Sequence, residues 1–228
     1  MSCFIDPTKQ LSWDALSSYI NPYVLGAPDN LIQHNARLSA IEFCRRSGIL
    51  HDENLIDLQT GVQDYFLTTV CDYEVVRVFE VTMLDRWVIR PSITKPRKFN
   101  NFAGFNSVSY YGTNWWCGPY GFYMQNVDVI HITPATQQNF TQGLRVEFIV
   151  QPKQDGCVLD NYLYEYWAEG IAAGAIARLC LIKNTSWYDP GLFKEFDMKF
   201  RNELNRARGT VDMNFSSGSM MMQSERWI

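Results

Sequence analysis

The spacing of apolar residues divides the chain into stretches with different periods. Residues 11–70 and 158–208 place apolar side chains at helical spacing, whereas residues 72–152 alternate apolar and polar positions as a strand does. Neither period continues after residue 209. The pattern predicts a mixed fold, with helices at both ends of a strand-rich middle and a loose tail.

The first stretch predicts a short helix and a long helix joined by a turn. Ser12 can cap a helix over 13–20, and Pro22 ends it because proline disfavours the helical conformation of the residue before it. Pro28 and Asp29 stand where a second helix begins. The buried face that we expect for this helix consists of Leu31, Leu38, Ile41 and Cys44.

The middle stretch predicts an antiparallel sheet or a small sandwich. Residues 144–151 alternate most clearly, and 73–84 and 122–132 are rich in strand-forming residue types. We expect a turn at 141–143 before the last strand. Residues 100–121 combine glycines with aromatic residues, which favours a long structured loop over regular structure.

The second helical stretch predicts two helices with different faces. Ala and Gly dominate 168–177, so this helix is thin and another backbone can approach it closely. Its larger side chains share one stripe made of Leu163, Trp167, Ile171 and Arg178. Asp189 and Pro190 start the next helix, whose other face mixes both charges. Its apolar face is Leu192, Phe193, Phe196, Phe200 and Leu204.

Residues 209–228 contain apolar groups that a solvated tail has no reason to carry. Gly, Ser, Asn and Met predominate there, so the segment cannot bury enough surface to order itself. We therefore expect an arm that becomes ordered on a partner, although an unselected frayed end is the alternative. Its apolar contacts would come from Met220, Met221, Met222, Trp227 and Ile228.

Composition and charge exclude several classes of function. A hydrophobic share of 46% in 228 residues indicates a folded protein, and seven Trp, twelve Tyr and fourteen Phe exceed the needs of its core. The net charge of −4 argues against binding of nucleic acid through phosphate neutralisation. We expect no secretory signal and no membrane span, and dispersed cysteines indicate a reducing compartment.

The common catalytic and metal-binding motifs are absent from the sequence. It has no phosphate-binding loop, nucleophile elbow or HExxH pattern. His34 and His51 stand seventeen residues apart with no Cys or carboxylate completing a ligand set, and His131 alternates within a strand. Glu165 and Glu169 have a spacing that is common by chance. We expect no catalytic residue, no metal and no cofactor.

The loop at 110–123 is the most unusual stretch, because it concentrates aromatic residues between glycines. We expect it to pack on a neighbouring subunit or to cover one end of the sheet. The interface residues would be Tyr111, Trp115, Trp116 and Tyr120. A carbohydrate-binding module that uses this loop is the alternative, since stacked aromatic rings also bind sugars.

Two stretches resemble a known family. The first is YVLGAPDNLI at 23–32 with AIEFCRRS at 40–47, and the second is EGIAAGAIARL at 169–179 with WYDP at 187–190 and NRAR at 205–208. They look like the head-to-tail adaptor proteins of tailed bacteriophages, also called connector or head-completion proteins. Together they cover rather less than half of the chain.

The resemblance implies a helical bundle built from both ends of the chain around an inserted β domain. An α+β fold of this kind would have helical segments at 1–71 and 158–208, an inserted antiparallel β-sheet or sandwich at 72–157 and an extended C-terminal arm at 209–228. The middle departs most from the family, because 85–121 is longer and more aromatic than expected.

The resemblance also implies partners and a location. Family members form a homo-oligomeric ring, commonly twelvefold, that docks beneath the portal protein and joins it to the next tail or nozzle protein. Genomic DNA passes through the channel without specific binding. The arm would clasp the portal, and the protein would be made in the host cytoplasm and end in the neck of the virion. No membrane is involved.

Overall fold

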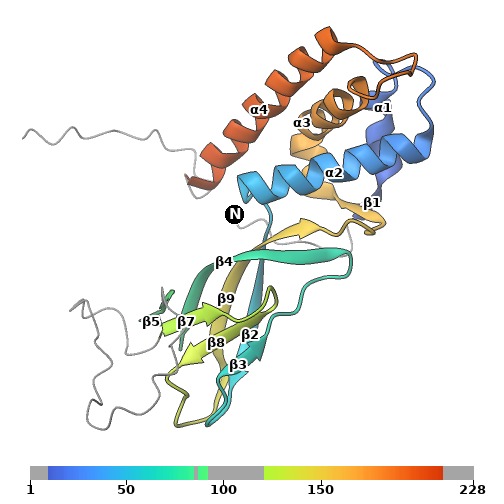
Figure 1. The fold of residues 1–228 in the computed structure, drawn as a ribbon. Helices are drawn as coiled ribbons and strands as arrows, with labels where there is room; N and C mark the ends of the chain where they lie inside the picture. The colour runs from blue at the N-terminus through green and yellow to red at the C-terminus, as the bar shows by residue number, and fades with distance from the viewer. Residues whose placement is uncertain (1–9, 85–86, 92–120, 213–228) are drawn as a thin grey trace, which may run out of the picture. The chain divides into compact units, whose positions relative to one another are not determined.

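The computed structural model describes residues 10–84, 87–91 and 121–212, and it has a mixed α+β architecture (Figure 1). The predicted α+β class is therefore confirmed. The described residues form two compact units. The helical unit comprises 10–51, 70–74 and 150–212, and the strand unit comprises 52–69, 75–84, 87–91 and 121–149.

The helical unit contains residues from the beginning and the end of the described chain. Strands β1 and β10 pair antiparallel, with Gln10 opposite Asp160. The side-chain oxygen of Ser12 accepts a hydrogen bond from the Asp14 amide at 3.3 Å, so the predicted cap is confirmed. The elements are β1 (Gln10–Ser12), the 3-10 helix η1 (Trp13–Leu16), α1 (Ser17–Ile20), α2 (Asp29–Ser47), β10 (Val158–Asp160), α3 (Asn161–Cys180) and α4 (Pro190–Asp212).

Small residues allow α3 to pack closely against both α2 and α4. The Ser39 hydroxyl of α2 donates a hydrogen bond to the Ile171 carbonyl of α3 at 2.7 Å. A Cβ atom on Gly174 would overlap Ser39 Oγ and lie 2.7 Å from the Phe200 ring, and one on Gly170 would lie 2.8 Å from Glu203 Cβ. The predicted thin packing helix is therefore confirmed.

The buried face of α2 differs from the predicted one. Leu31 and Leu38 are only half-buried, while Ala36 and Ser39 are fully buried. Small side chains such as Ala36 and Ser39 are buried together with Ile32 and Phe43, and the Ser39 hydroxyl contacts the α3 backbone. The buried residues of α2 are Ile32, Asn35, Ala36, Ser39, Ala40, Ile41, Phe43, Cys44 and Ser47.

The start of α4 agrees with the sequence, but its end does not. Asp189 Oδ1 accepts hydrogen bonds from the amides of Gly191 at 2.8 Å and Leu192 at 3.0 Å, which confirms the predicted cap. The helix continues through Gly209 to Asp212 instead of ending at residue 208. One glycine destabilises a helix by only about 1 kcal/mol. This cost alone does not end α4 at Gly209.

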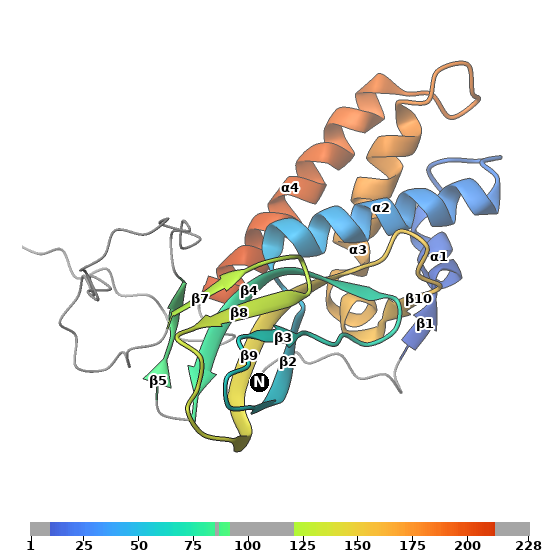
Figure 2. The ribbon, with the colours of Figure 1, turned by 60° about the horizontal axis from the view of Figure 1, so that its bottom comes forward.

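The strand unit is built from two four-stranded sheets with the orders β2-β9-β4-β5 and β3-β8-β7-β6 (Figure 2). β4–β5, β3–β8 and β7–β8 are antiparallel, whereas β6 and β7 are parallel. Strands β2, β4 and β9 also extend into the helical unit. The bounds are β2 (His51–Leu58), β3 (Asp64–Phe66), β4 (Tyr73–Met83), β5 (Trp87–Val88), β6 (Arg90–Pro91), β7 (Gly121–Met124), β8 (Val129–Thr133) and β9 (Phe140–Pro152).

Two local predictions in this region were wrong. Residues 51–58 and 64–66, predicted within a helical segment, form β2 and β3, because pairing with distant strands outweighs a weak local pattern. Residues 141–143 lie inside β9, where Gln142 has a φ of 51° and Gly143 is buried.

The predicted strand character of 122–132 is confirmed. The stretch contains β7 and most of β8 with a reversal between them, and Gln125 N donates to Val129 O at 2.9 Å.

The clearest sequence pattern is confirmed. Leu144, Val146 and Phe148 are fully buried in β9, and the intervening Arg145 and Glu147 are half-buried. β9 lies between β2 and β4 in its sheet, so it has a paired neighbour on each edge. Ile149, Val150 and Gln151 near its end are buried as well, so side chains on both faces of β9 are covered there.

Candidate interaction surface

Both groups of interface residues predicted from the sequence lie outside the described residues. One group is the aromatic set Tyr111, Trp115, Trp116 and Tyr120, and the other is the arm set Met220, Met221, Met222, Trp227 and Ile228. Of the loop at 110–123, only 121–123 are described, and they belong to β7. The roles assigned to these residues, and the carbohydrate-binding alternative, stay predictions.

The histidines occupy three different environments. His34 is exposed on α2, and His51 is buried at the start of β2. The Nδ1 atom of His131 lies 2.5 Å from Asp64 Oδ1, which links β8 to β3, and its ring stacks on Tyr123 at 4.5 Å between centroids. Among the described residues no three His, Cys, Asp or Glu side chains are placed to hold a metal ion.

Glu165 and Glu169 are exposed on α3 and bind different partners. Glu165 accepts a hydrogen bond from Asn161 Nδ2 at 2.6 Å, one turn earlier on the same helix. Glu169 forms an ion pair with Lys199 of α4, with 3.2 Å between Oε2 and Nζ. Each carboxylate therefore has its own partner, and these contacts do not pair Glu165 with Glu169 as an acid and a base.

The two buried thiols are poor nucleophiles. Burial, and secondarily the charge of Asp160, raises the pKa of the Cys44 thiol far above its ordinary value. Burial, and secondarily the charge of Asp189, also raises the pKa of Cys180. Because the thiolate is the reactive form, both residues act as small apolar side chains, as their places in the helical pattern indicated.

An open groove on the helical unit is one of several hollows on the surface of the described residues. It has a volume of about 290 Å³. α3 supplies its floor, and the walls come from α4 and from α1 with the residues that follow it. It is lined by Ser18, Tyr19, Pro22, Tyr23, Glu169, Ala172, Ala173, Ile176, Phe196 and Lys199. We call these residues the α1/α3/α4 groove.

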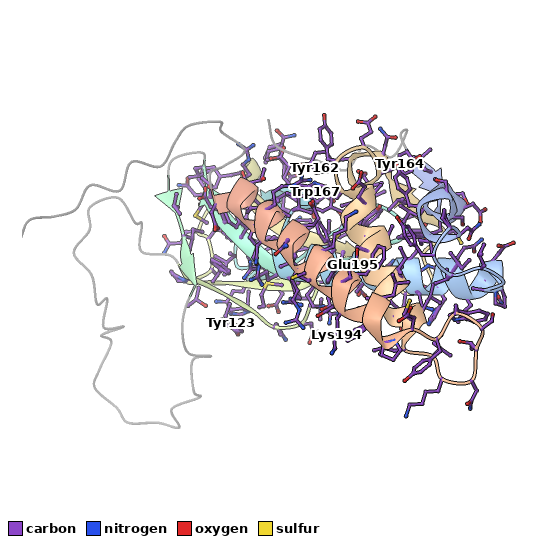
Figure 3. All side chains as sticks on the ribbon, turned by 90° about the horizontal axis from the view of Figure 1, so that it is seen from above. Tyr123, Tyr162, Tyr164, Trp167, Lys194 and Glu195 are labelled. Carbon is purple, nitrogen blue, oxygen red and sulfur yellow. The ribbon has the colours of Figure 1, made fainter. Side chains whose placement is uncertain are left out.

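A second hollow of about 370 Å³ adjoins the groove along α4. Tyr23, Phe196 and Lys199 line both hollows, so the two are neighbours. Met198 in the second hollow is 60% exposed. Figure 3 shows Glu195, which also lines it, on the α4 ribbon.

Aromatic rings make the walls of the groove. Tyr23 meets Phe196 edge to face with 4.8 Å between centroids, yet 50% of Tyr23 remains exposed. Tyr19 meets Tyr164 of α3 in the same manner at 6.3 Å and is 38% exposed. Such half-exposed tyrosines present rigid apolar area together with a hydroxyl group, a combination that is enriched at protein interfaces.

The local sequence explains why the groove is hollow. Ala172 and Ala173 on α3 project only a methyl group, which leaves the floor low. Pro22 follows the end of α1, and Gly26 adopts a φ of 85°, so the chain reverses before α2 and Tyr23 lies over Phe196. The sequence predictions did not single out Tyr19 and Tyr23. Their spacing of four around the buried Ile20 was the available signal.

The rim of the groove is polar but nearly balanced in charge. The Glu169–Lys199 ion pair joins α3 to α4 there, and Ser18 adds a hydroxyl group. Such a surface does not suit a strongly charged ligand. Its exposed lining combines the aromatic rings with these polar groups.

No known protein family matches the chain, and no curated protein matches it in sequence. No α-helix in the described part of the chain has the length and apolar character needed to cross a membrane. The fold and the groove define a mixed α+β protein with an open, aromatic-walled surface on its helical unit.

Proposed function

We propose that the chain is a structural head-to-tail adaptor of a tailed bacteriophage. It would assemble into a ring, dock on the portal protein and link it to the next tail or nozzle protein, and leave a channel through which genomic DNA passes. The protein would have no enzymatic activity and would reside in the neck of the virion. Its helical unit would be the bundle of that family, with the strand unit as the insertion.

The observation that carries the proposal is the location of the residues that resemble the family. Residues 23–32 cover the turn before α2 and the start of α2, and 169–179 belong to the second half of α3. Residues 187–190 lead into α4. All belong to the helical unit, which unites residues from before and after the strand unit. This arrangement supports a family whose members build one bundle from both ends of the chain.

Unburied apolar surface also supports a role in assembly. The α1/α3/α4 groove exposes parts of Tyr19 and Tyr23, and residues 220–228 add methionines and a tryptophan. Burying one Trp removes about 150–250 Å² from water, an upper bound of about 4–6 kcal/mol at 25 cal/mol/Å². Repeated around a closed ring, even weak contacts of this kind give a lasting attachment, because each later contact forms at high effective concentration.

The acidic balance suits a passage for DNA. A net charge of −4 does not favour tight binding to phosphates, and a strongly basic lumen would hold the genome back. We assign portal contact to Met220, Met221, Met222, Trp227 and Ile228, and contact with neighbouring subunits or the tail to Tyr111, Trp115, Trp116 and Tyr120.

Deletion of residues 213–228 tests the role of the arm while leaving α4 complete. We expect the truncated protein to keep its helical circular dichroism but to lose co-sedimentation with portal rings encoded by the same phage genome. A matched control, Ser216→Ala with Ser217→Ala, keeps every apolar residue of the arm and should bind as the intact protein does. Full occupancy of portal rings by the truncated protein would refute the arm's role.

A further inference from the structure

We infer that the open edge of β4 in the strand unit is a docking site for an extended, positively charged segment of another protein, which adds to the sheet as a further strand. Recognition of this kind goes beyond the proposed function and does not depend on the phage assignment. Three features of the strand unit support it: the edge of β4, an apolar hollow beside that edge, and an excess of negative charge.

β4 is paired along one edge but only near its end on the other. It has β9 on one side and β5 on the other. β5 is far shorter than β4 (Figure 2) and pairs only with residues 82 and 83. Just before them, Val81 O accepts a hydrogen bond from Ile89 N at 2.7 Å. Among the described residues, no strand pairs with residues 75–80 on this edge.

The alternation of a strand shows which backbone groups face the open edge. Residues two apart present their N–H and C=O groups to the same edge. Because Val81 faces β5, the N–H and C=O groups of Arg77 point to the same side, where the described residues supply no strand. Such an edge is a template for a further strand. The backbone that fits it is therefore extended and not helical.

An apolar hollow of about 470 Å³ lies beside this edge. Apolar groups make up most of its exposed lining, and Phe79, Val88 and Val127 are 50%, 45% and 64% exposed. An added strand buries alternate side chains in the hollow, so its partner needs apolar residues at every second position. The lining consists of residues 76–80 of β4, residues 88–89, and residues 122–124 and 126–127 of β7 and the turn after it.

The hollow lies where the chain passes from one sheet to the other. β5 belongs to the sheet of β4, and β6 belongs to the sheet of β7. Ile89 lies between β5 and β6 and is buried. β5 and β6 have only two residues each, so the much longer β4 extends past both. The open part of β4 and the apolar hollow therefore have the same local origin.

The strand unit carries excess negative charge, which sets the charge of the partner. Its described residues include seven carboxylates and three arginines. Burial raises the pKa of Glu147 on β9, and the charges of Glu80 and Glu53 add to this effect, while Arg145 opposes it only in part. Glu80 also lines the hollow. A segment with lysine or arginine side chains therefore complements this region.

The same charges disfavour β4 of a second copy as the partner. Antiparallel pairing of the two open stretches 75–79 would centre on Arg77 and would place the two Arg77 side chains opposite each other. Like charges that lie directly opposite each other destabilise a strand pair. Two strand units of the same negative charge would also repel each other. The partner is therefore a different protein whose segment alternates basic and apolar residues.

Binding of three synthetic eight-residue peptides to the full-length protein tests the inference. The first alternates Lys and Val, the second alternates Lys and Gly, and the third alternates Glu and Val. We expect the Lys–Val peptide to bind about tenfold more tightly than either of the others, as measured by fluorescence polarisation. The Lys–Gly peptide is the control for charge alone, and the Glu–Val peptide is the control for strand preference alone.

Arg77→Pro and Arg77→Val separate backbone pairing from side-chain contact. Both substitutions remove the guanidinium group, but only proline removes the N–H group at the open edge. Proline is tolerated in a strand where its nitrogen faces away from the sheet. We expect the Pro variant to bind the Lys–Val peptide about tenfold more weakly than the Val variant does. Circular dichroism shows whether both variants are folded.

A second pair of variants applies if Arg77→Pro does not fold. Val127→Lys places a positive charge at an exposed position of the hollow, and Val127→Thr is its uncharged control. The Lys variant should bind the Lys–Val peptide more weakly than the Thr variant. Hydrogen exchange of the unmodified protein with this peptide should show new protection in residues 75–80.

Several results would overturn the inference. Equal binding of the Lys–Val and Lys–Gly peptides would show attraction by charge without strand addition. Equal weakening by Arg77→Pro and Arg77→Val would show that the side chain, and not the backbone edge, is recognised. Absence of binding by the Lys–Val peptide, or protection confined to other residues, would show that the edge is not a docking site in the intact protein.

Discussion

At the scale of single residues, small side chains decide how the helical unit packs. Gly174 has no room for a Cβ atom between Ser39 and the Phe200 ring. Ser39, which a hydrophobicity pattern counts as polar, is fully buried because its hydroxyl donates to the Ile171 carbonyl. Contacts of this kind depend on the distance between backbones, so residue types alone do not reveal them.

Replacement of Gly174 by Ala should therefore destabilise the protein, although alanine is the better helix former. Overpacking typically costs about 1–3 kcal/mol, and the gain in helix propensity returns about 1 kcal/mol. We expect a net loss of up to about 2 kcal/mol in the free energy of unfolding, measured by urea denaturation.

Gly209 in α4 is the matched control for this prediction. A Cβ atom there meets nothing within 4 Å, so Gly209→Ala should be neutral or should stabilise by up to about 1 kcal/mol. Equal effects of the two substitutions would show that propensity, and not the α2–α3–α4 contact, determines the result.

At the scale of elements, Glu42 ties α2 to α3. Its carboxylate contacts Arg178 of α3 and lies 2.8 Å from Arg46 on its own helix. Partial burial alone would raise the pKa of Glu42, but the hydrogen bond from Arg46 and the charges of Arg178 and Arg46 outweigh it and hold the pKa below its usual value. The ionised form is therefore favoured in the folded protein.

Because the pKa of Glu42 is lowered in the folded protein, the stabilisation that its ionised carboxylate contributes depends on pH. It is present above the ordinary pKa of a glutamate and is lost as the pH falls through the lower pKa of the folded state. Glu42→Gln should reduce the free energy of unfolding at pH 7 by no more than about 1 kcal/mol, because the groups are partly exposed. The difference should vanish at strongly acidic pH.

Glu165→Gln is the control, since Glu165 accepts its hydrogen bond from Asn161 of the same helix and does not join two elements. Chemical denaturation at pH 7 and at strongly acidic pH provides the measurement. A Glu42→Gln effect that persists unchanged at acidic pH would contradict the ionic origin of the stabilisation.

Elements that depend on local chemistry could be predicted, and those that depend on distant partners could not. Neighbouring residues determine the helix caps at Ser12 and Asp189 and the alternation along β9, so these features could be predicted. β2 has no clear period of its own and becomes a strand because β9 lies beside it. The end of α4 was missed because one glycine is a weak stop signal.

The candidate surface was predictable only in part. The surplus of aromatic residues correctly indicated exposed apolar area, and Tyr19 and Tyr23 belong to that surplus. Their contact with α3 and α4 could not be read from the sequence, because it joins residues separated by more than a hundred positions. The loop and arm residues named from the sequence lie outside the described residues, so their roles stay predictions.

At the scale of the whole molecule, the described residues form two units with different secondary structure. The helical unit combines residues from both sides of the strand unit and carries the groove, and the strand unit contributes two four-stranded sheets. In the proposed adaptor, the helical unit joins the copies into a ring, while the strand unit is free to meet neighbours or the tail. On this proposal, the exposed apolar side chains of the helical unit serve assembly.

Cryo-electron microscopy of the full-length protein mixed with the portal protein of the same phage tests this account most directly. We predict rings of the protein seated on one end of the portal, with an open channel through both. Particles in which the portal stays bare while the protein remains monomeric would contradict the account.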